Sequence, residues 1–188
     1  MALRTGEEVP SLLPEEVLAM SDSIDDISRW LQSKPFQDNP EWFESSASQT
    51  SSTWDDWVQQ GRDIPELENR LIWILKHDKD PVNRSAVALA LGCVGGDPSI
   101  ESLITVLESD VPMVAMEAAA SLGRLGRSEA IEPLCEALRS ADANVRANAC
   151  TALGGLGGEK ALSCLKNAEM DQDSFVQAAA KEALQRSC

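Results

Sequence analysis

The chain has 188 residues, a hydrophobic content of 43% and a formal net charge of −15. These values are typical of a folded protein, and no apolar run approaches the roughly 18 residues of a membrane span. Because so large a negative charge repels nucleic-acid phosphates and acidic lipids, we expect no nucleic-acid partner and no membrane insertion, whereas a basic patch on another protein would be attracted.

Cysteine usage and the opening stretch bear on the cellular compartment. The cysteines are odd in number, lie far apart and include no C-x-x-C pair, so the sequence predicts neither a disulfide framework nor a zinc knuckle. The opening stretch, MALRTGEEVPSLLPEE, is acidic and lacks the basic start and apolar middle of a signal peptide. We therefore expect reduced thiols and a cytoplasmic location, in a cytosol-like or stroma-like reducing compartment. The cysteines are Cys93, Cys135, Cys150, Cys164 and Cys188.

Residues 1–62 are interpreted as an acidic N-terminal arm, with 12 acidic and 4 basic side chains. The Ser-rich stretch at 44–53 predicts a flexible link, and SIDDISRWLQS and TWDDWVQQG predict short amphipathic helices. Such helices cannot form a core of their own, so their tryptophans need a surface to contact. Either the arm packs on the following repeats and caps them, or it is a recognition segment that orders on a partner. The arm residues expected to make contacts are Trp30, Trp42, Trp54 and Trp57.

A repeat with a period of 31 residues occupies residues 63–188. The segments ALGCVGG, SLGRLGR and ALGGLGG, which begin at residues 90, 121 and 152, align without a gap. The glycines therefore predict a turn at which the first helix of each unit ends. The alternative for ALGGLGGEK is a phosphate-binding loop, which needs Ser or Thr after its lysine. Here no such residue follows Lys160, and a carboxylate, Glu159, precedes it.

Each unit predicts two short helices, because apolar residues recur with helical spacing in both halves of the unit. Asp110, Asp142 and Asp173 sit where the next unit begins, and aspartate is suited to cap a helix there. Two short helices cannot bury their faces alone, so neighbouring units must stack into a solenoid. We expect a leading helix at 65–75, three units and a final helix at 173–185. The apolar stripe of the third unit consists of Val145, Ala149, Ala152, Leu153 and Leu156.

The repeat units resemble the short HEAT-like repeat of the phycobilisome-lyase type. The resemblance rests on DKDPVNRSAVALALGCVGGDPSIESLITVL, VPMVAMEAAASLGRLGRSEAIEPLCEAL and DANVRANACTALGGLGGEKALSCL, and it spans about residues 65–188. It implies an all-α fold, a short right-handed α-solenoid of HEAT-like helical hairpins with a 31-residue period, preceded by the acidic Trp-containing arm. The fold does not name a function, because HEAT-like arrays serve as scaffolds, as bilin lyase subunits and as a few enzymes.

The resemblance also raises an enzymatic option that can be checked by residue. HEAT-like deoxyhypusine hydroxylases bind two irons through His-Glu pairs near the start of the first helix of a unit, and no such pair survives here. The only histidine, His77, ends the leading helix, where a cation suits the helix dipole. We therefore expect no metal site and no catalytic residue. The residues at the matching positions are Ser85-Ala86, Met116-Glu117, Ala147-Asn148 and Ala178-Ala179.

Helical geometry predicts which residues of the first helices point outward. If Val145 and Leu153 face the core, then Ala147, Cys150 and Thr151 face away from it. The resemblance implies that these helices line the concave side, so the exposed strip is small and mildly apolar and suits a docking helix or an extended peptide. The corresponding outward positions in other units are Ser85, Ala88, Leu89, Met116, Ala119, Ala120, Ala178, Lys181 and Glu182. The predicted partner-binding residues are Arg84, Ser85, Leu89, Met116, Ala120, Ala147, Thr151 and Lys181.

Two arginines, Arg84 and Arg146, occupy the same repeat position. In one interpretation each bridges to the next repeat by pairing with Glu117 or Asn148, and in the other they bind an acidic ligand. Cysteines 135, 150 and 164 are interpreted as small packing residues.

We interpret the chain as a non-enzymatic scaffold or adaptor that binds a partner protein through the concave face of its repeats, while the arm either caps the repeats or extends this binding surface. The expected partner carries a basic patch or a docking helix, and no cofactor is expected. The alternative is a phycobilin lyase subunit, or another factor in chromophore attachment or turnover of the phycobilisome, which would bind a bilin. No catalytic residue can be carried over for that alternative.

Overall fold

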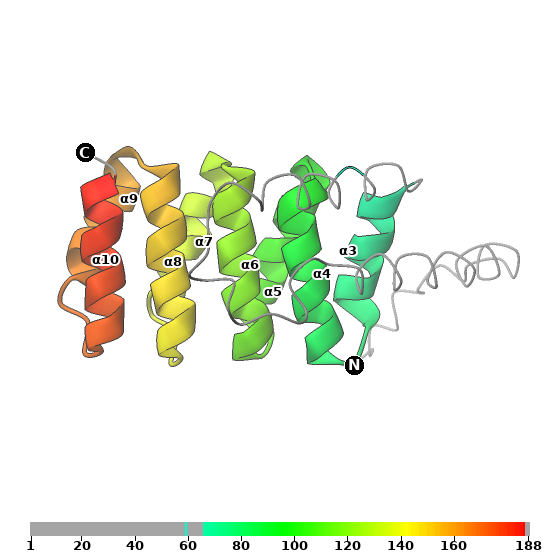
Figure 1. The fold of residues 1–188 in the computed structure, drawn as a ribbon, viewed down its shortest axis with the longest axis horizontal. Helices are drawn as coiled ribbons and strands as arrows, with labels where there is room; N and C mark the ends of the chain where they lie inside the picture. Colours follow the sequence, from blue (N-terminus) through cyan, green and yellow to red (C-terminus); the bar gives the residue numbers. More distant parts are fainter. Residues whose placement is uncertain (1–58, 60–65, 187–188) are drawn as a thin grey trace, which may run out of the picture. The chain divides into compact units, whose positions relative to one another are not determined.

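The computed structural model describes Gln59 and residues 66–186, and these residues contain helices and no strand (Figure 1). The helices are α3 (Leu67–His77), α4 (Pro81–Val94), α5 (Asp97–Ser109), α6 (Pro112–Leu125), the 3₁₀ turn η2 (Ser128–Ala130), α7 (Ile131–Ala137), α8 (Ala143–Leu156), α9 (Gly158–Ala168) and α10 (Ser174–Arg186).

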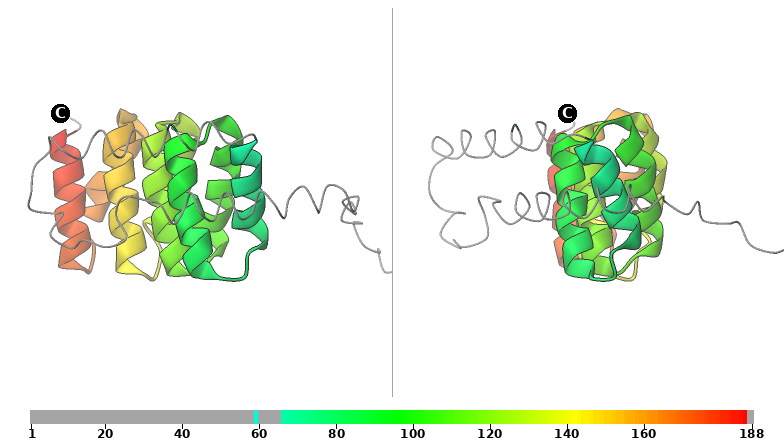
Figure 2. Two further views of the ribbon diagram at one scale, coloured as in Figure 1. Left: turned by 45° about the vertical axis from the view of Figure 1, so that its right-hand side comes forward. Right: turned by 90° about the vertical axis from the view of Figure 1, so that its right-hand side faces the viewer.

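The helices form two layers, which Figures 1 and 2 show from three directions. The first layer contains α4, α6, α8 and α10, and the second contains α3, α5, α7 and α9. Three hairpins, α4–α5, α6–α7 and α8–α9, therefore stand between a leading helix and a final helix, as the 31-residue period predicts. The all-α solenoid predicted from the repeat is confirmed.

Aspartates begin three of the first-layer helices. The carboxylates of Asp80, Asp142 and Asp173 each accept a hydrogen bond from the backbone N–H two residues further on, which satisfies a donor left open by the helix start. The capping predicted for Asp142 and Asp173 is therefore confirmed. The prediction for Asp110 is wrong: in α6 the capping position falls one residue later, on Val111, whose side chain cannot accept a hydrogen bond.

Glycines 95, 126 and 157 follow the first-layer helices directly, as predicted. Gly126 and Gly157 have φ values of 69° and 66°, in the left-handed region that glycine adopts at little cost. Glycines 95, 126 and 157 therefore mark the turn between the two helices of each hairpin, as predicted.

Glycines 92, 123 and 154 lie inside their helices, so the prediction that they also belong to the turn is wrong. A Cβ atom on Gly123 would lie 2.8 Å from the Cβ of Ala152 on α8, and one on Gly154 would lie 2.6 Å from that of Ala183 on α10. A Cβ on Gly92 would lie 2.6 Å from that of Ser121 on α6. Glycine is needed here because consecutive first-layer helices cross in contact at this position.

Neighbouring first-layer helices contact one another far more extensively than α5, α7 and α9 contact one another. Tighter packing in one layer favours curvature of the array toward that layer. The core lies between the layers, where Leu91, Leu122, Leu134, Leu153 and Leu165 are fully buried.

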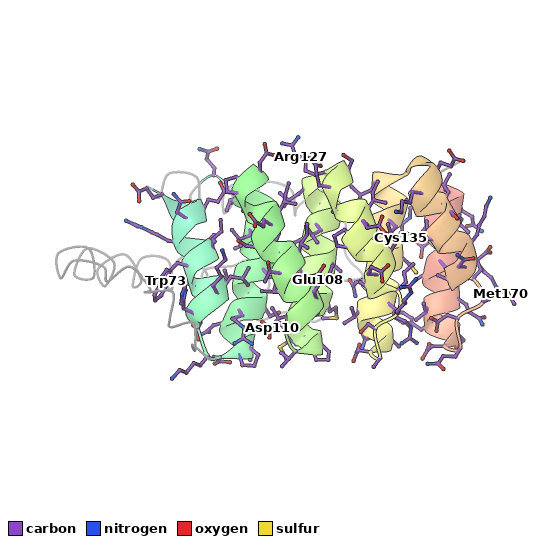
Figure 3. The ribbon with its side chains drawn as sticks, turned by 180° about the vertical axis from the view of Figure 1, so that it is seen from behind. Trp73, Glu108, Asp110, Arg127, Cys135 and Met170 are labelled. Atoms are coloured by element: carbon purple, nitrogen blue, oxygen red, sulfur yellow. A yellow bond between two sulfur atoms is a disulfide. The ribbon has the colours of Figure 1, made fainter. Side chains whose placement is uncertain are left out.

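The second layer contains a disulfide between Cys135 on α7 and Cys164 on α9, whose Cα atoms are 5.8 Å apart. The prediction that these two cysteines are separate reduced packing residues is therefore wrong for this structure. They lie 29 residues apart, and the stagger of adjacent helices brings such residues opposite each other. Figure 3, which views the second layer, labels Cys135.

The arm, its tryptophans (Trp30, Trp42, Trp54 and Trp57) and the predicted boundary at residue 62 lie outside the described residues. Within the described part of the chain, no helix is long and apolar enough to cross a membrane.

Candidate functional site

The predicted partner-binding residues differ in their accessibility. Thr151 and Lys181 are exposed, and four others are partly exposed: Arg84, Ser85, Met116 and Ala120. Leu89 and Ala147 are only 8% and 3% exposed, so they do not belong to a contact surface in this structure. The partner-binding surface therefore contains fewer residues than the position of each residue around its helix predicts.

The reason for this difference is the close packing within the first layer. Ala88, Ala119 and Cys150, which share one repeat position and are predicted to point outward, are fully buried. The same position on α10 carries Lys181, which is exposed because no further repeat helix follows α10 in the described residues. Small side chains at this position in three units are the sequence signal that it faces the next helix.

A groove with a volume of about 330 Å³ lies between α6 and α8 on the first-layer face. It brings together two of the predicted residues, Ala120 from α6 and Thr151 from α8, and Met116 lies one turn before Ala120 on the same helix. The other lining residues are Gly123, Arg124, Asn148, Ala152 and Gly155.

Gly155 and Arg124 were missed at the sequence level. They occupy the same repeat position, and a Cβ on Gly155 would meet no atom within 4 Å, so the absence of a side chain there widens the groove. Gly155 is the glycine of ALGGLGG that has no counterpart in the other two units, and this irregularity is the signal that could have found it.

The polar side chains at the groove make hydrogen bonds to groups within their own helices. The Arg124 guanidinium donates to a carboxylate oxygen of Glu117 and to the Ser121 hydroxyl, both at 3.3 Å, and its side chain remains 43% exposed. The Thr151 hydroxyl donates to the Ala147 carbonyl oxygen at 3.2 Å. The groove therefore offers small side chains on its floor and one cation at its rim.

Arg84 and Arg146 bridge adjacent repeats, but not through Glu117 or Asn148. Arg84 donates to both carboxylate oxygens of Asp110, from Nε at 2.8 Å and from Nη2 at 2.5 Å. Arg146 holds Asp171 in the same two-pronged way, at 2.9 and 3.0 Å. The predicted partners are wrong because each arginine lies in the first turn of its helix and reaches the loop before the next first-layer helix.

The ion pairs Arg84–Asp110 and Arg146–Asp171 connect parts of the fold, so both arginines are already paired and are not positioned to bind an acidic ligand. The hydrogen bond from Arg84 lowers the pKa of Asp110 below its ordinary value, and that from Arg146 lowers the pKa of Asp171. Both carboxylates therefore remain ionised and paired at neutral pH. Burial raises the pKa of Cys150 to about 11, so this thiol stays protonated and unreactive.

Residues 100–185 match the family model of HEAT repeats. The chain is a HEAT-like repeat protein. A search of the curated proteins finds no match.

The solved structures that share the fold of this HEAT-like chain include a human hydroxylase and a phycocyanin lyase complex. Human deoxyhypusine hydroxylase in complex with glycerol is similar with 22% sequence identity and a TM-score of 0.58, over 73% of this chain and 55% of that one. The complex of CpcE and CpcF of phycocyanin lyase from Nostoc sp. PCC7120 is similar with 21% identity and a TM-score of 0.62, over 100% of this chain and 69% of that one. The chain thus spans about half the length of the human protein. These similarities concern the fold.

No group of three or more His, Cys, Asp or Glu side chains in the described residues is arranged to hold a metal ion. His77 stacks on Trp73, with ring centroids 4.7 Å apart, and its Nδ1 lies 2.8 Å from the Trp73 carbonyl oxygen. This histidine therefore belongs to the exposed end of α3, as predicted, and not to the groove.

Proposed function

We propose that this HEAT-like repeat protein is a non-enzymatic adaptor that binds a partner protein on its first-layer face, centred on the α6–α8 groove. The observation that carries the proposal is the groove itself, which lies at the middle of the repeat array and brings together Ala120 and Thr151. No cofactor is part of this proposal.

The shape of the groove supports a polypeptide ligand rather than a small polar substrate. The volume of about 330 Å³ is at the lower end of the range of about 300–1,000 Å³ for ligand pockets. Alanine, glycine and threonine allow a partner backbone to approach closely, and Arg124 supplies donors for its carbonyl oxygens. An extended segment or a helix with small residues fits these features.

The bilin alternative gains no specific support, because the likeness to the phycocyanin lyase complex has only 21% identity and concerns the fold. The proposed partner is a protein with a basic region around its docking segment, which the net charge of −15 would attract.

The experiment uses the full chain to capture a partner, identifies it by mass spectrometry and then measures the affinity of the purified pair by calorimetry. Gly155→Arg places a long charged side chain across the groove, and we expect at least about tenfold weaker binding because that charge would be buried without a partner. The substitution should not destabilise α8, because arginine has a higher helix propensity than glycine by up to about 1 kcal/mol.

The matched control is Ser163→Arg, which adds the same charge to an exposed position on α9 in the second layer. This variant should bind as the unmodified chain does. Equal affinity of the Gly155→Arg variant and the unmodified chain would show that the groove is not the binding surface.

A further inference from the structure

One repeat position of the first-layer helices carries a long polar side chain in three helices and an alanine in the fourth. Arg84, Arg146 and Gln177 each donate to the backbone carbonyl oxygen six residues earlier, at 2.8, 2.8 and 2.7 Å. The corresponding residue of α6 is Ala115, whose methyl group has no donor. The hydrogen bond from this helix position to the loop before the helix is therefore missing in α6.

The carboxylate that would pair with an arginine at this position is missing too. Arg84 binds the aspartate 26 residues later, and Arg146 binds the aspartate 25 residues later. Counted from Ala115, those positions are Ala141 and Ser140. Both members of the ion pair are thus replaced together, so the change leaves no unpaired charge in the fold.

A cavity occupies the space of the missing side chain. It has a volume of about 330 Å³ and is lined by Ala115, by Ser140 and by residues at the ends of α5 and α7, including Glu108 and Glu136. We call it the arginine slot. It is separate from the α6–α8 groove, with which it shares no lining residue.

The charge around the slot favours a cation. Asp110 at its edge is neutralised by Arg84, and Glu136 is paired with Arg139 at 2.6 Å. Glu108 lines the slot, is exposed and has no cation partner among residues 66–186. Figure 3 labels Glu108 and Asp110, the latter at the lower edge of the molecule.

Among residues 66–186, most of the exposed large apolar side chains lie at the same edge, where the first-layer helices begin. Val82, Met113 and Phe175 share the second position of their helices and are 59%, 47% and 59% exposed, and Val111 is 43% exposed. A row of apolar side chains beside a cavity is typical of a protein-binding surface. This edge therefore offers a partner both an apolar track and a pocket.

We propose that the arginine slot receives the guanidinium of an arginine from a partner protein whose neighbouring apolar side chains lie along this edge. The partner's arginine fills the space that the Arg84 and Arg146 side chains fill in the other units, and the carboxylate of Glu108 at the slot is its acceptor, a charged pairing that suits the planar guanidinium. The proposal concerns a second surface and does not depend on the groove.

The test titrates the ¹⁵N-labelled full chain with acetyl-arginine amide and, separately, with acetyl-citrulline amide, which has nearly the same shape but no charge. We expect the backbone amide resonances of Ala115 and Ser140 to shift and to saturate with the arginine probe. The citrulline probe should bind at least about tenfold more weakly, because hydrogen bonds to a charged group are stronger.

Three variants complete the test. Ala115→Arg combined with Ala141→Asp rebuilds the pair seen at Arg84 and Asp110, so the protein should fold and no longer bind the probe. Glu108→Gln changes one exposed side chain and should weaken the probe several-fold, whereas Ala178→Arg on α10 should bind it as the unmodified chain does. The proposal is overturned by absent shifts at Ala115 and Ser140, by equal binding of both probes, or by undiminished binding to the double variant.

Discussion

The two layers of the solenoid are held together differently. In the first layer, glycines 92, 123 and 154 let helices approach to direct contact. Two ion pairs, Arg84–Asp110 and Arg146–Asp171, also connect α4 to the loop before α6 and α8 to the loop before α10. In the second layer the helices contact one another less, and a covalent bond between Cys135 and Cys164 joins two of them. Direct helix packing therefore dominates in the first layer, whereas in the second layer one disulfide supplements weaker contacts between the helices.

Loss of the buried arginine pair should have the largest effect on stability. Arg146 is 4% exposed, so replacing it by leucine leaves Asp171 as a largely buried charge without its partner. We expect the free energy of unfolding at pH 7 to fall by about 3–5 kcal/mol, measured by urea denaturation. Arg139→Leu, which removes an exposed ion pair, is the control and should cost under about 1 kcal/mol.

The Arg146–Asp171 pair also makes the free energy of unfolding depend on pH. Because Arg146 lowers the pKa of Asp171, the stabilisation is present in full above the ordinary aspartate pKa and is lost as the pH falls through the folded value. The difference between the unmodified chain and the Arg146→Leu variant should therefore shrink as the pH is lowered from about 4, the ordinary aspartate pKa, through the lower folded value. A difference that stays constant over this range would contradict the assigned role of the pair.

A side chain at the helix crossing should have the next largest effect. In the Gly123→Leu variant the added Cβ would meet the Cβ and Cα of Ala152 at 2.8 and 2.9 Å, so the two helices must separate. We expect a loss of about 2–3 kcal/mol by thermal or urea unfolding. Gly155→Leu makes the same substitution where the added Cβ meets nothing within 4 Å, and it should not destabilise the fold. Equal losses would show that helix contact is not what requires glycine.

Breaking the disulfide should affect the second layer rather than the first. The bridge closes a loop between residues 29 apart, so Cys135→Ser combined with Cys164→Ser should lower the free energy of unfolding by about 2 kcal/mol. Hydrogen exchange measured by mass spectrometry should accelerate in α7 and α9 and change little in α6 and α8. Acceleration confined to α6 and α8 would reverse the proposed division between the layers.

Met116→Glu should have the smallest effect on stability. Met116 is partly exposed, and its neighbours Val114, Ala118 and Leu122 in the core stripe are fully buried, so the change should cost under about 1 kcal/mol. Binding of a captured partner should nevertheless weaken, because the new carboxylate would be buried beneath it. A calorimetric affinity equal to that of the unmodified chain would exclude Met116 from the surface.

The sequence predicts the helices and their order well, because a strict period with apolar stripes and capping aspartates determines them locally. It predicts contacts between units less well, because these depend on the stagger of neighbouring helices. Gly123 with Ala152, Gly154 with Ala183, and the two bridged cysteines are all pairs separated by 29 residues, two short of the period. A search for complementary residues at that separation would have found the glycine contacts and the disulfide.

The predicted contact surface was only partly recovered for the same reason. A helical wheel describes one helix, and it places Cys150 and Leu89 outward because it contains no adjacent repeat. The structure buries both and leaves Ala120 and Thr151 at a groove that exists only between two helices. The unusual residues of the repeat, Gly155 and Ala115, line the α6–α8 groove and the arginine slot, so departures from the period indicate candidate binding surfaces that the period itself does not.

The central claim, that a partner protein binds on the first-layer face, is tested most directly by hydrogen exchange on the full chain with and without its captured partner. The account predicts slower exchange in the α6 and α8 segments that border the groove, with α9 unchanged. Slower exchange confined to α7 and α9, or no change in the groove segments while the partner is bound, would contradict it.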